Sequence, residues 1–110
     1  MGGVVSAGSA AYRVGNAMEP ATPFDPARMG KLRFRAWHRG TREADYMIGG
    51  FFDRYHATWD ETALAWFEAL VEEDDVEIMA WALKTEPLPA RFAGAQMDLM
   101  MKLDYVDIPR

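Results

Sequence analysis

Apolar residues recur at helical spacing along this chain from residue 25 onward. Asp25 and Pro26 form a helix-start signal, because aspartate caps orphan amides and proline suits the first helical position. The apolar positions that follow lie three or four residues apart: Met29, Leu32 and Ala36. Glycine commonly ends a helix, so we expect this first helix to end near His38 or Arg39, just before Gly40.

A second helix is predicted directly after Gly40. Thr41 is its expected N-cap, and Glu43 falls in the first turn, where the helix dipole favours a carboxylate. Its apolar stripe comprises Met47, Ile48, Phe51, Phe52 and Tyr55. Gly49 and Gly50 interrupt this helix, and each weakens it by roughly 1 kcal/mol relative to alanine. We expect the glycines to permit close approach of a neighbouring helix.

Two more helix starts follow. Thr58–Glu61 has the pattern of a capping box, with Thr58 as the N-cap. The expected buried face of this third helix is Leu64, Phe67 and Val71. The acidic residues 72–75 interrupt the pattern, and Asp75 is expected to cap a fourth helix that ends before Pro87. The predicted buried set of the fourth helix has i, i+3, i+4, i+7 spacing: Val76, Met79, Ala80 and Leu83.

A fifth helix is predicted over residues 90–103. Its expected apolar face is Phe92, Ala95, Leu99 and Leu103. Residues 1–24 are rich in glycine, alanine and serine and are interrupted by proline, so we expect a disordered arm there. Residues 105–110 are predicted to form a tail. No segment alternates with period two, so we predict an all-α fold, a small helical bundle over residues 25–104.

Composition narrows the classes of function. With 110 residues, four Trp and six Phe, the chain is expected to form one domain whose core depends on large rings. A formal net charge of −5 argues against nucleic-acid binding, which requires neutralisation of phosphates. The absence of cysteine excludes disulfides and thiolate ligands. No apolar run approaches the roughly 20 residues that span a bilayer, so we expect no membrane anchor.

Motifs for catalysis and cofactor binding are absent from the sequence. His38 and His56 do not form an HExxH pattern, and neither GxSxG, GxGxxG nor a P-loop occurs. We therefore predict that the chain is not an enzyme and holds neither a metal nor a cofactor of its own. The rival interpretation is an enzyme or metal protein that uses both histidines with nearby carboxylates.

One segment, residues 31–45, concentrates candidate interaction residues. A basic helix end, a glycine turn and an acidic helix start lie together in it. Local structure alone could explain part of this pattern, because Gly40 can stop one helix and Thr41 can cap the next. The density of arginine, beside a tryptophan and a histidine that we expect to be exposed, indicates an interface. The candidate partner-binding residues are Trp37, His38, Arg39, Gly40, Arg42, Glu43 and Asp45.

Two motifs carry a family resemblance. Residues 39–43, Arg-Gly-Thr-Arg-Glu, match an RGxxE pattern, and residues 67–81 combine an apolar helix end, an acidic turn and a helix with Trp81. In this order and spacing the chain resembles the FAD assembly factors of succinate dehydrogenase over residues 31–103. It departs from the pattern at His38, where many members have a second arginine, and at Val76, where many have proline.

The resemblance implies a five-helix bundle that binds the flavoprotein subunit of succinate dehydrogenase and promotes covalent attachment of FAD to it. Whether fumarate reductase is also served stays open. The RGxxE surface would contact the flavoprotein, which itself carries the FAD. We expect a monomer in the free state, in a bacterial cytoplasm rather than a mitochondrial matrix, because the motif has its bacterial form. The alternative is a generic helical adaptor or regulator unrelated to flavin, against which only the two motifs argue.

Overall fold

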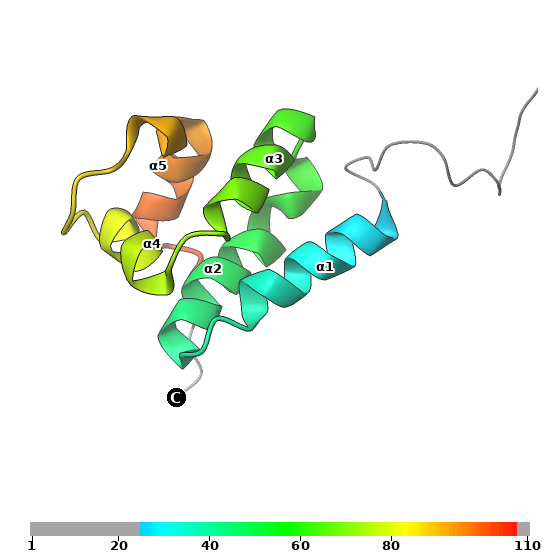
Figure 1. The fold of residues 1–110 in the computed structure, drawn as a ribbon, viewed down its shortest axis with the longest axis horizontal. Helices are drawn as coiled ribbons and strands as arrows, with labels where there is room; N and C mark the ends of the chain where they lie inside the picture. The colour runs from blue at the N-terminus through cyan, green and yellow to red at the C-terminus, as the bar shows by residue number, and fades with distance from the viewer. Residues whose placement is uncertain (1–24, 108–110) are drawn as a thin grey trace, which may run out of the picture.

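The computed structural model describes residues 25–107, which form an all-α bundle without strands (Figure 1). The five helices of this part of the chain are α1 (Pro26–Trp37), α2 (Arg42–Tyr55), α3 (Glu61–Leu70), α4 (Asp75–Ala82) and α5 (Ala95–Lys102). Two 3-10 turns, η1 (His56–Thr58) and η2 (Ala90–Phe92), join them. α2 and α3 lie in the middle, with α1 on one side and α4 and α5 on the other. The predicted fold class is confirmed, whereas the predicted arm 1–24 lies outside the described residues.

The first two helices begin where the sequence predicted. The Asp25 carboxylate accepts a hydrogen bond from the Ala27 amide at 2.9 Å. The Thr41 hydroxyl oxygen accepts one from the Ala44 amide at 3.1 Å. α1 ends at Trp37, also as expected. These starts were predictable because each depends on hydrogen bonds between residues that are two or three positions apart.

The predicted capping box before α3 is wrong. Thr58 belongs to η1 and donates its hydroxyl to a backbone carbonyl three residues earlier. The N-cap is Asp60, whose carboxylate accepts a hydrogen bond from the Ala63 amide at 2.9 Å. Glu61, the other half of the expected box, binds Arg28 of α1 at 2.7 Å instead. The extra 3-10 turn after α2 moves the start of α3 two residues along the chain.

The predicted buried face of α4 is also wrong. Val76 is 79% exposed and Leu83 is 49% exposed. The helix buries a different set: Ile78, Trp81 and Ala82. Asp74 is the N-cap, and the expected cap Asp75 lies in the first turn, where it is paired with Arg39. Apolar residues of α4 lie on almost all sides of the helix, so their spacing did not decide which side is buried. The ion pair between Asp75 and Arg39 and the burial of the large Trp81 indole decided it.

The predicted fifth helix is two elements, η2 and α5, separated near Gly94, which has φ of 145°. The buried residues of this region are Phe92, Met97 and Met100, whereas Ala95 is exposed. Tyr105, expected in a tail, belongs to the core with 9% exposure. Its hydroxyl has no hydrogen-bond partner within the described chain, and burial raises its pKa. Of the predicted tail, residues 108–110 lie outside the described residues.

Aromatic rings meet at the centre of the bundle around Phe51. This ring is fully buried and lies 6.1 Å from the Phe67 ring and 5.4 Å from the Tyr105 ring, centroid to centroid. Trp59 and Trp66 also contact these rings, and both indole N–H groups are hydrogen-bonded. Among the described helices, none combines the length and apolar character needed to cross a membrane.

Candidate functional site

The connection between α1 and α2, residues 38–41, is called the RG turn here. Gly40 has φ of 112°, a left-handed conformation that side chains with a Cβ adopt only under strain. A Cβ built at Gly40 would meet no atom of residues 25–107 within 4 Å. Glycine is therefore required by the backbone of the turn, and no side chain of the described residues covers it.

Arg39 is nearly buried, with 9% of its side chain exposed. Its guanidinium donates to the carbonyl oxygens of Val71 and Glu73, both at 2.8 Å, and to that of Arg35 at 3.2 Å. Its Nε also lies 2.6 Å from the Asp75 carboxylate. These bonds join the end of α1 to the loop between α3 and α4. Arg39 therefore holds the RG turn in place through contacts within the chain.

The start of α2 presents the acidic part of the motif. Asp45 accepts a hydrogen bond from the Arg39 amide at 2.6 Å, which closes the turn. Arg42 and Glu43 are exposed in the first turn of the helix. Within residues 25–107 the Glu43 carboxylate has neither a hydrogen bond nor an ion pair. Glu43 is therefore available to a basic group from outside the chain.

Trp37 and His38 flank the turn in different environments. The Trp37 indole lies over Gly49 of α2, where an added Cβ would come within 2.3 Å of the ring, so the expected exposure of Trp37 is only partial. Its ring meets Tyr46 edge-on at 5.3 Å. His38 is exposed and stacks on Phe34 at 3.9 Å. The expected close approach at the paired glycines is confirmed at Gly49, and the approaching group is an indole.

Phe34 is a further candidate contact residue, which the sequence motifs do not include. Its side chain is 61% exposed beside the RG turn. The signal was available, because Phe34 lies off the apolar stripe that runs through Leu32 and Ala36 on α1. The two histidines are the C-caps of different helices, His38 of α1 and His56 of α2. No group of three acidic or histidine side chains in the described chain is arranged to hold a metal.

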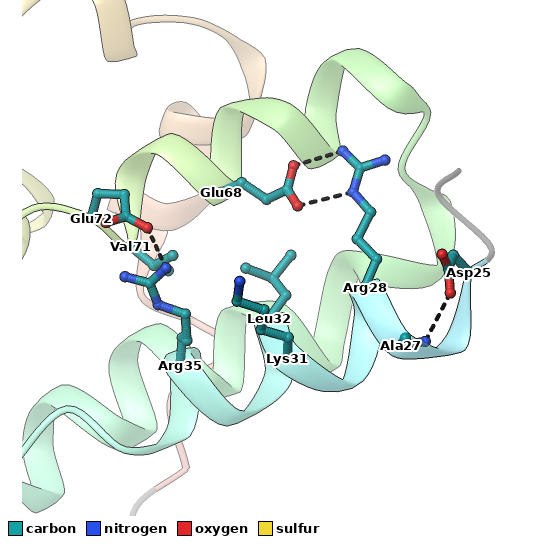
Figure 2. A pocket seen from close by; sticks show the side chains of 9 residues that line it. All are labelled: Asp25, Ala27, Arg28, Lys31, Leu32, Arg35, Glu68, Val71 and Glu72. Atoms are coloured by element: carbon teal, nitrogen blue, oxygen red, sulfur yellow. Dashed lines mark hydrogen bonds and ion pairs between the residues drawn. The ribbon is translucent and has the colours of Figure 1, made fainter. Parts of the chain in front are cut away.

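A second surface, the groove between α1 and α3, has a volume of about 510 Å³ (Figure 2). Arg28 of α1 binds Glu68 of α3 through two nitrogens at 2.6 and 2.9 Å. The same guanidinium binds Glu61 through two further contacts at 2.7 and 2.8 Å. Arg28 is thus shared by two carboxylates and fixes the start of α1 against α3.

The other end of the groove is closed by Arg35 and Glu72, which form an ion pair. Leu32 and Val71 supply its apolar lining, and Lys31 lies between the two ion-pair clusters. Arg28 and Arg35 of α1 thus both pair with carboxylates on α3 or just after it. We interpret the groove as part of the packing interface between α1 and the rest of the bundle.

Low pH should weaken the interface between α1 and the rest of the bundle. Hydrogen bonds from Arg28 lower the pKa of Glu61, and those from Arg35 lower the pKa of Glu72. A carboxylate with a lowered pKa in the folded state stabilises the fold above its unfolded pKa, about 4.3, and this contribution disappears as pH falls through the lowered value. We expect the urea concentration at the unfolding midpoint to decrease as the pH is lowered from about 5 to about 3. In Arg28→Gln this midpoint should change less steeply with pH.

Arg33→Gln is the matched control for that experiment. Arg33 pairs with Asp53 at 2.9 Å, but both side chains are about half exposed, so their ion pair contributes little. The pH slope of this variant should equal that of the unmodified chain. If the midpoint of Arg28→Gln also changes with pH as steeply as that of the unmodified chain, protonation of the groove carboxylates is not coupled to folding.

Comparison with known proteins places the chain among succinate dehydrogenase assembly proteins. Residues 30–104 match the family model described as "Flavinator of succinate dehydrogenase". The chain is 37% identical over 76 residues to the FAD assembly factor SdhE of Acetobacter pasteurianus, a match that covers 69% of this chain and 70% of that protein. It is 32% identical over 78 residues to the mitochondrial succinate dehydrogenase assembly factor 2 of Saccharomyces cerevisiae, covering 68% of this chain. The match spans about half of the yeast protein, 48% of its length.

Proposed function

Because this chain belongs to the family of succinate dehydrogenase flavinators, as its two motifs predicted, we propose that it assists covalent attachment of FAD to the flavoprotein subunit of succinate dehydrogenase. The family match over residues 30–104, which includes the RG turn, is the observation that carries this proposal. In this role the chain is an assembly factor that contributes no reacting group, and the flavoprotein holds the FAD. The bacterial relative favours a bacterial cytoplasm as the compartment.

The candidate residues divide into two roles in this proposal. Arg39 and Asp45 shape the RG turn from within the chain, through the bonds described above. Gly40 and Glu43 meet the flavoprotein. The space above Gly40 admits a partner backbone, and the exposed Glu43 carboxylate forms a charge-assisted hydrogen bond to a basic group on the partner.

Three further candidates border the same surface. Arg42 is exposed beside Glu43, and His38 is exposed on the α1 side of the turn. Trp37 contributes the exposed part of its indole. Arginine and tryptophan are frequent interface anchors, because they combine a large contact area with hydrogen-bonding groups. We expect these three residues to add to affinity without being indispensable.

The proposed mechanism is positioning. The groups that covalent flavinylation would bring together are a histidine of the flavoprotein and the methyl group of its own bound FAD. An assembly factor that docks on the flavoprotein can favour the domain arrangement in which these two groups are aligned. Holding reactants in a productive geometry removes a large part of a barrier, because the entropy of bringing them together has already been lost.

A flavinylation assay tests the proposal. The purified chain is mixed with the unflavinylated flavoprotein subunit of its own succinate dehydrogenase, FAD and a dicarboxylate, and flavin fluorescence is followed after denaturing electrophoresis. We expect the chain to accelerate covalent labelling. Gly40→Arg should abolish the acceleration, and Glu43→Ala should weaken docking roughly 10- to 100-fold, the range for loss of a charge-assisted hydrogen bond.

Gly94→Arg is the matched control for Gly40→Arg. Gly94 also has a positive φ, 145°, and a Cβ there would also meet no atom of the part of the chain that the structure describes within 4 Å. It is the N-cap of α5, which lies across α2 from α1 (Figure 1). The two variants therefore share backbone strain and added bulk but differ in location. Equal loss of activity in both would exclude docking at the RG turn, and no acceleration by the unmodified chain would overturn the assembly role itself.

A further inference from the structure

A hollow lies on the outer face of α2, beside the RG turn. Its volume is about 330 Å³. The rings of Trp37, Tyr46 and Tyr105 line it together with Gly50, and three charged residues complete the lining: Asp53, Arg54 and Asp107. This size is at the lower end of the roughly 300–1,000 Å³ typical of ligand pockets, so it suits a single side chain better than a whole cofactor.

Of the two adjacent glycines of α2, only Gly50 lines the hollow. At Gly49 the missing side chain is replaced by the Trp37 indole, which fills the space. At Gly50 a Cβ would lie 3.6 Å from the nearest atom of the Tyr105 ring, an ordinary contact. A side chain would therefore fit at Gly50, and it would favour the helix. Nothing within the described chain requires a glycine at this position.

The hollow continues the surface proposed to dock on the flavoprotein. Glu43, Tyr46 and Gly50 are spaced by three and four residues, so they share one face of α2. Seven residues make almost two helical turns, which places Gly50 about 10 Å along the axis from Glu43. The opposite face of α2 is buried in the core through Ala44, Met47, Ile48, Phe51 and Phe52.

We infer that this hollow receives one aromatic side chain from the flavoprotein subunit, as a second anchor beside the RG turn. The inference rests on the proposed function. The glycine leaves the floor free for a flat ring, and the rings of Trp37 and Tyr46 offer edges and faces with which an aromatic side chain pairs favourably. Aromatic anchors that fill preformed pockets near a polar contact are typical of energetically dominant interface residues.

Gly50→Leu tests the inference by filling the hollow from within the chain. Binding to the immobilised, unflavinylated flavoprotein subunit is measured by biolayer interferometry, and folding by thermal denaturation. We expect the Kd to rise at least tenfold while the melting temperature stays equal to that of the unmodified chain or rises. Gly50→Ala, whose methyl group fits the measured space, should raise the melting temperature and weaken binding only two- to threefold.

Ala65→Leu is the control, because Ala65 is exposed on α3 and the change adds leucine away from the hollow. Its Kd should not change. Absence of binding by the unmodified chain would overturn the proposed function together with this inference. Normal binding by Gly50→Leu would overturn the inference alone. Two further outcomes would assign the hollow to another occupant and would also overturn the inference. One is a dimer of the unmodified chain that Gly50→Leu dissociates. The other is a loss of thermal stability on deletion of residues 108–110 that Gly50→Leu restores.

Discussion

Arg39→Ala should lower the free energy of unfolding by about 3–5 kcal/mol, the range for breaking one side of a buried charge pair. The guanidinium of Arg39 is the hydrogen-bond donor to three backbone carbonyls and the ion-pair partner of Asp75. Its removal leaves these acceptors without a hydrogen-bond donor at a nearly buried site, where an unsatisfied polar group lowers the free energy of unfolding. The end of α1 would also lose its connection to the loop between α3 and α4.

Urea denaturation followed by circular dichroism measures this effect. Arg39→Lys should recover only a small part of the loss, because an ammonium group cannot reach several carbonyls in the geometry of the planar guanidinium. Arg33→Ala, at an exposed ion pair, should change stability by less than about 1 kcal/mol. Full stability of Arg39→Ala combined with lost docking would instead assign the guanidinium to direct contact with the partner.

Gly49→Ala should destabilise the bundle by about 2 kcal/mol, within the range for overpacking a core. Alanine is the better helix former by about 1 kcal/mol, so helix propensity alone predicts the opposite sign. The added Cβ would lie 2.3 to 2.7 Å from three atoms of the Trp37 ring. Either the indole moves out, which exposes apolar surface, or α1 shifts relative to α2.

A double-mutant cycle isolates this contact. In the background of Trp37→Ala the Gly49→Ala change should become neutral or stabilising, because the atoms it would meet are gone. Gly50→Ala is a neighbouring control that should stabilise the chain by up to about 1 kcal/mol, since its Cβ meets only ordinary contacts. Additive effects of the two changes at Trp37 and Gly49 would show that the ring and the glycine are not coupled.

Both predictions concern residues that support the RG turn from behind. Arg39 fixes the turn to the α3–α4 loop, and Trp37 fixes the end of α1 to α2. The exposed residues Gly40 and Glu43 are thus presented on a rigid support. In this account a variant of Arg39 weakens docking because the shape of the turn is lost, whereas Glu43→Ala weakens it at unchanged stability. Measuring stability and docking on the same variants separates the two causes.

Much of the candidate site could be predicted from the sequence, because its elements are local. The positive φ of Gly40, the Thr41 cap and the exposed Glu43 follow from residues within one or two turns of each other. The burial of the Arg39 side chain could not be predicted in this way. Its partners Val71, Glu73 and Asp75 are 32 to 36 residues away along the chain.

The sequence by itself determined the all-α class, the starts of α1 and α2, the position of the RG turn and the two family motifs. These features depend on capping hydrogen bonds and on residue identity at short range. Only the tertiary structure decided which face of α4 is buried, because a helix that is apolar almost all round is oriented by what packs against it. It alone also brought the Trp37 indole onto Gly49, since contacts between helices depend on packing rather than on local preference.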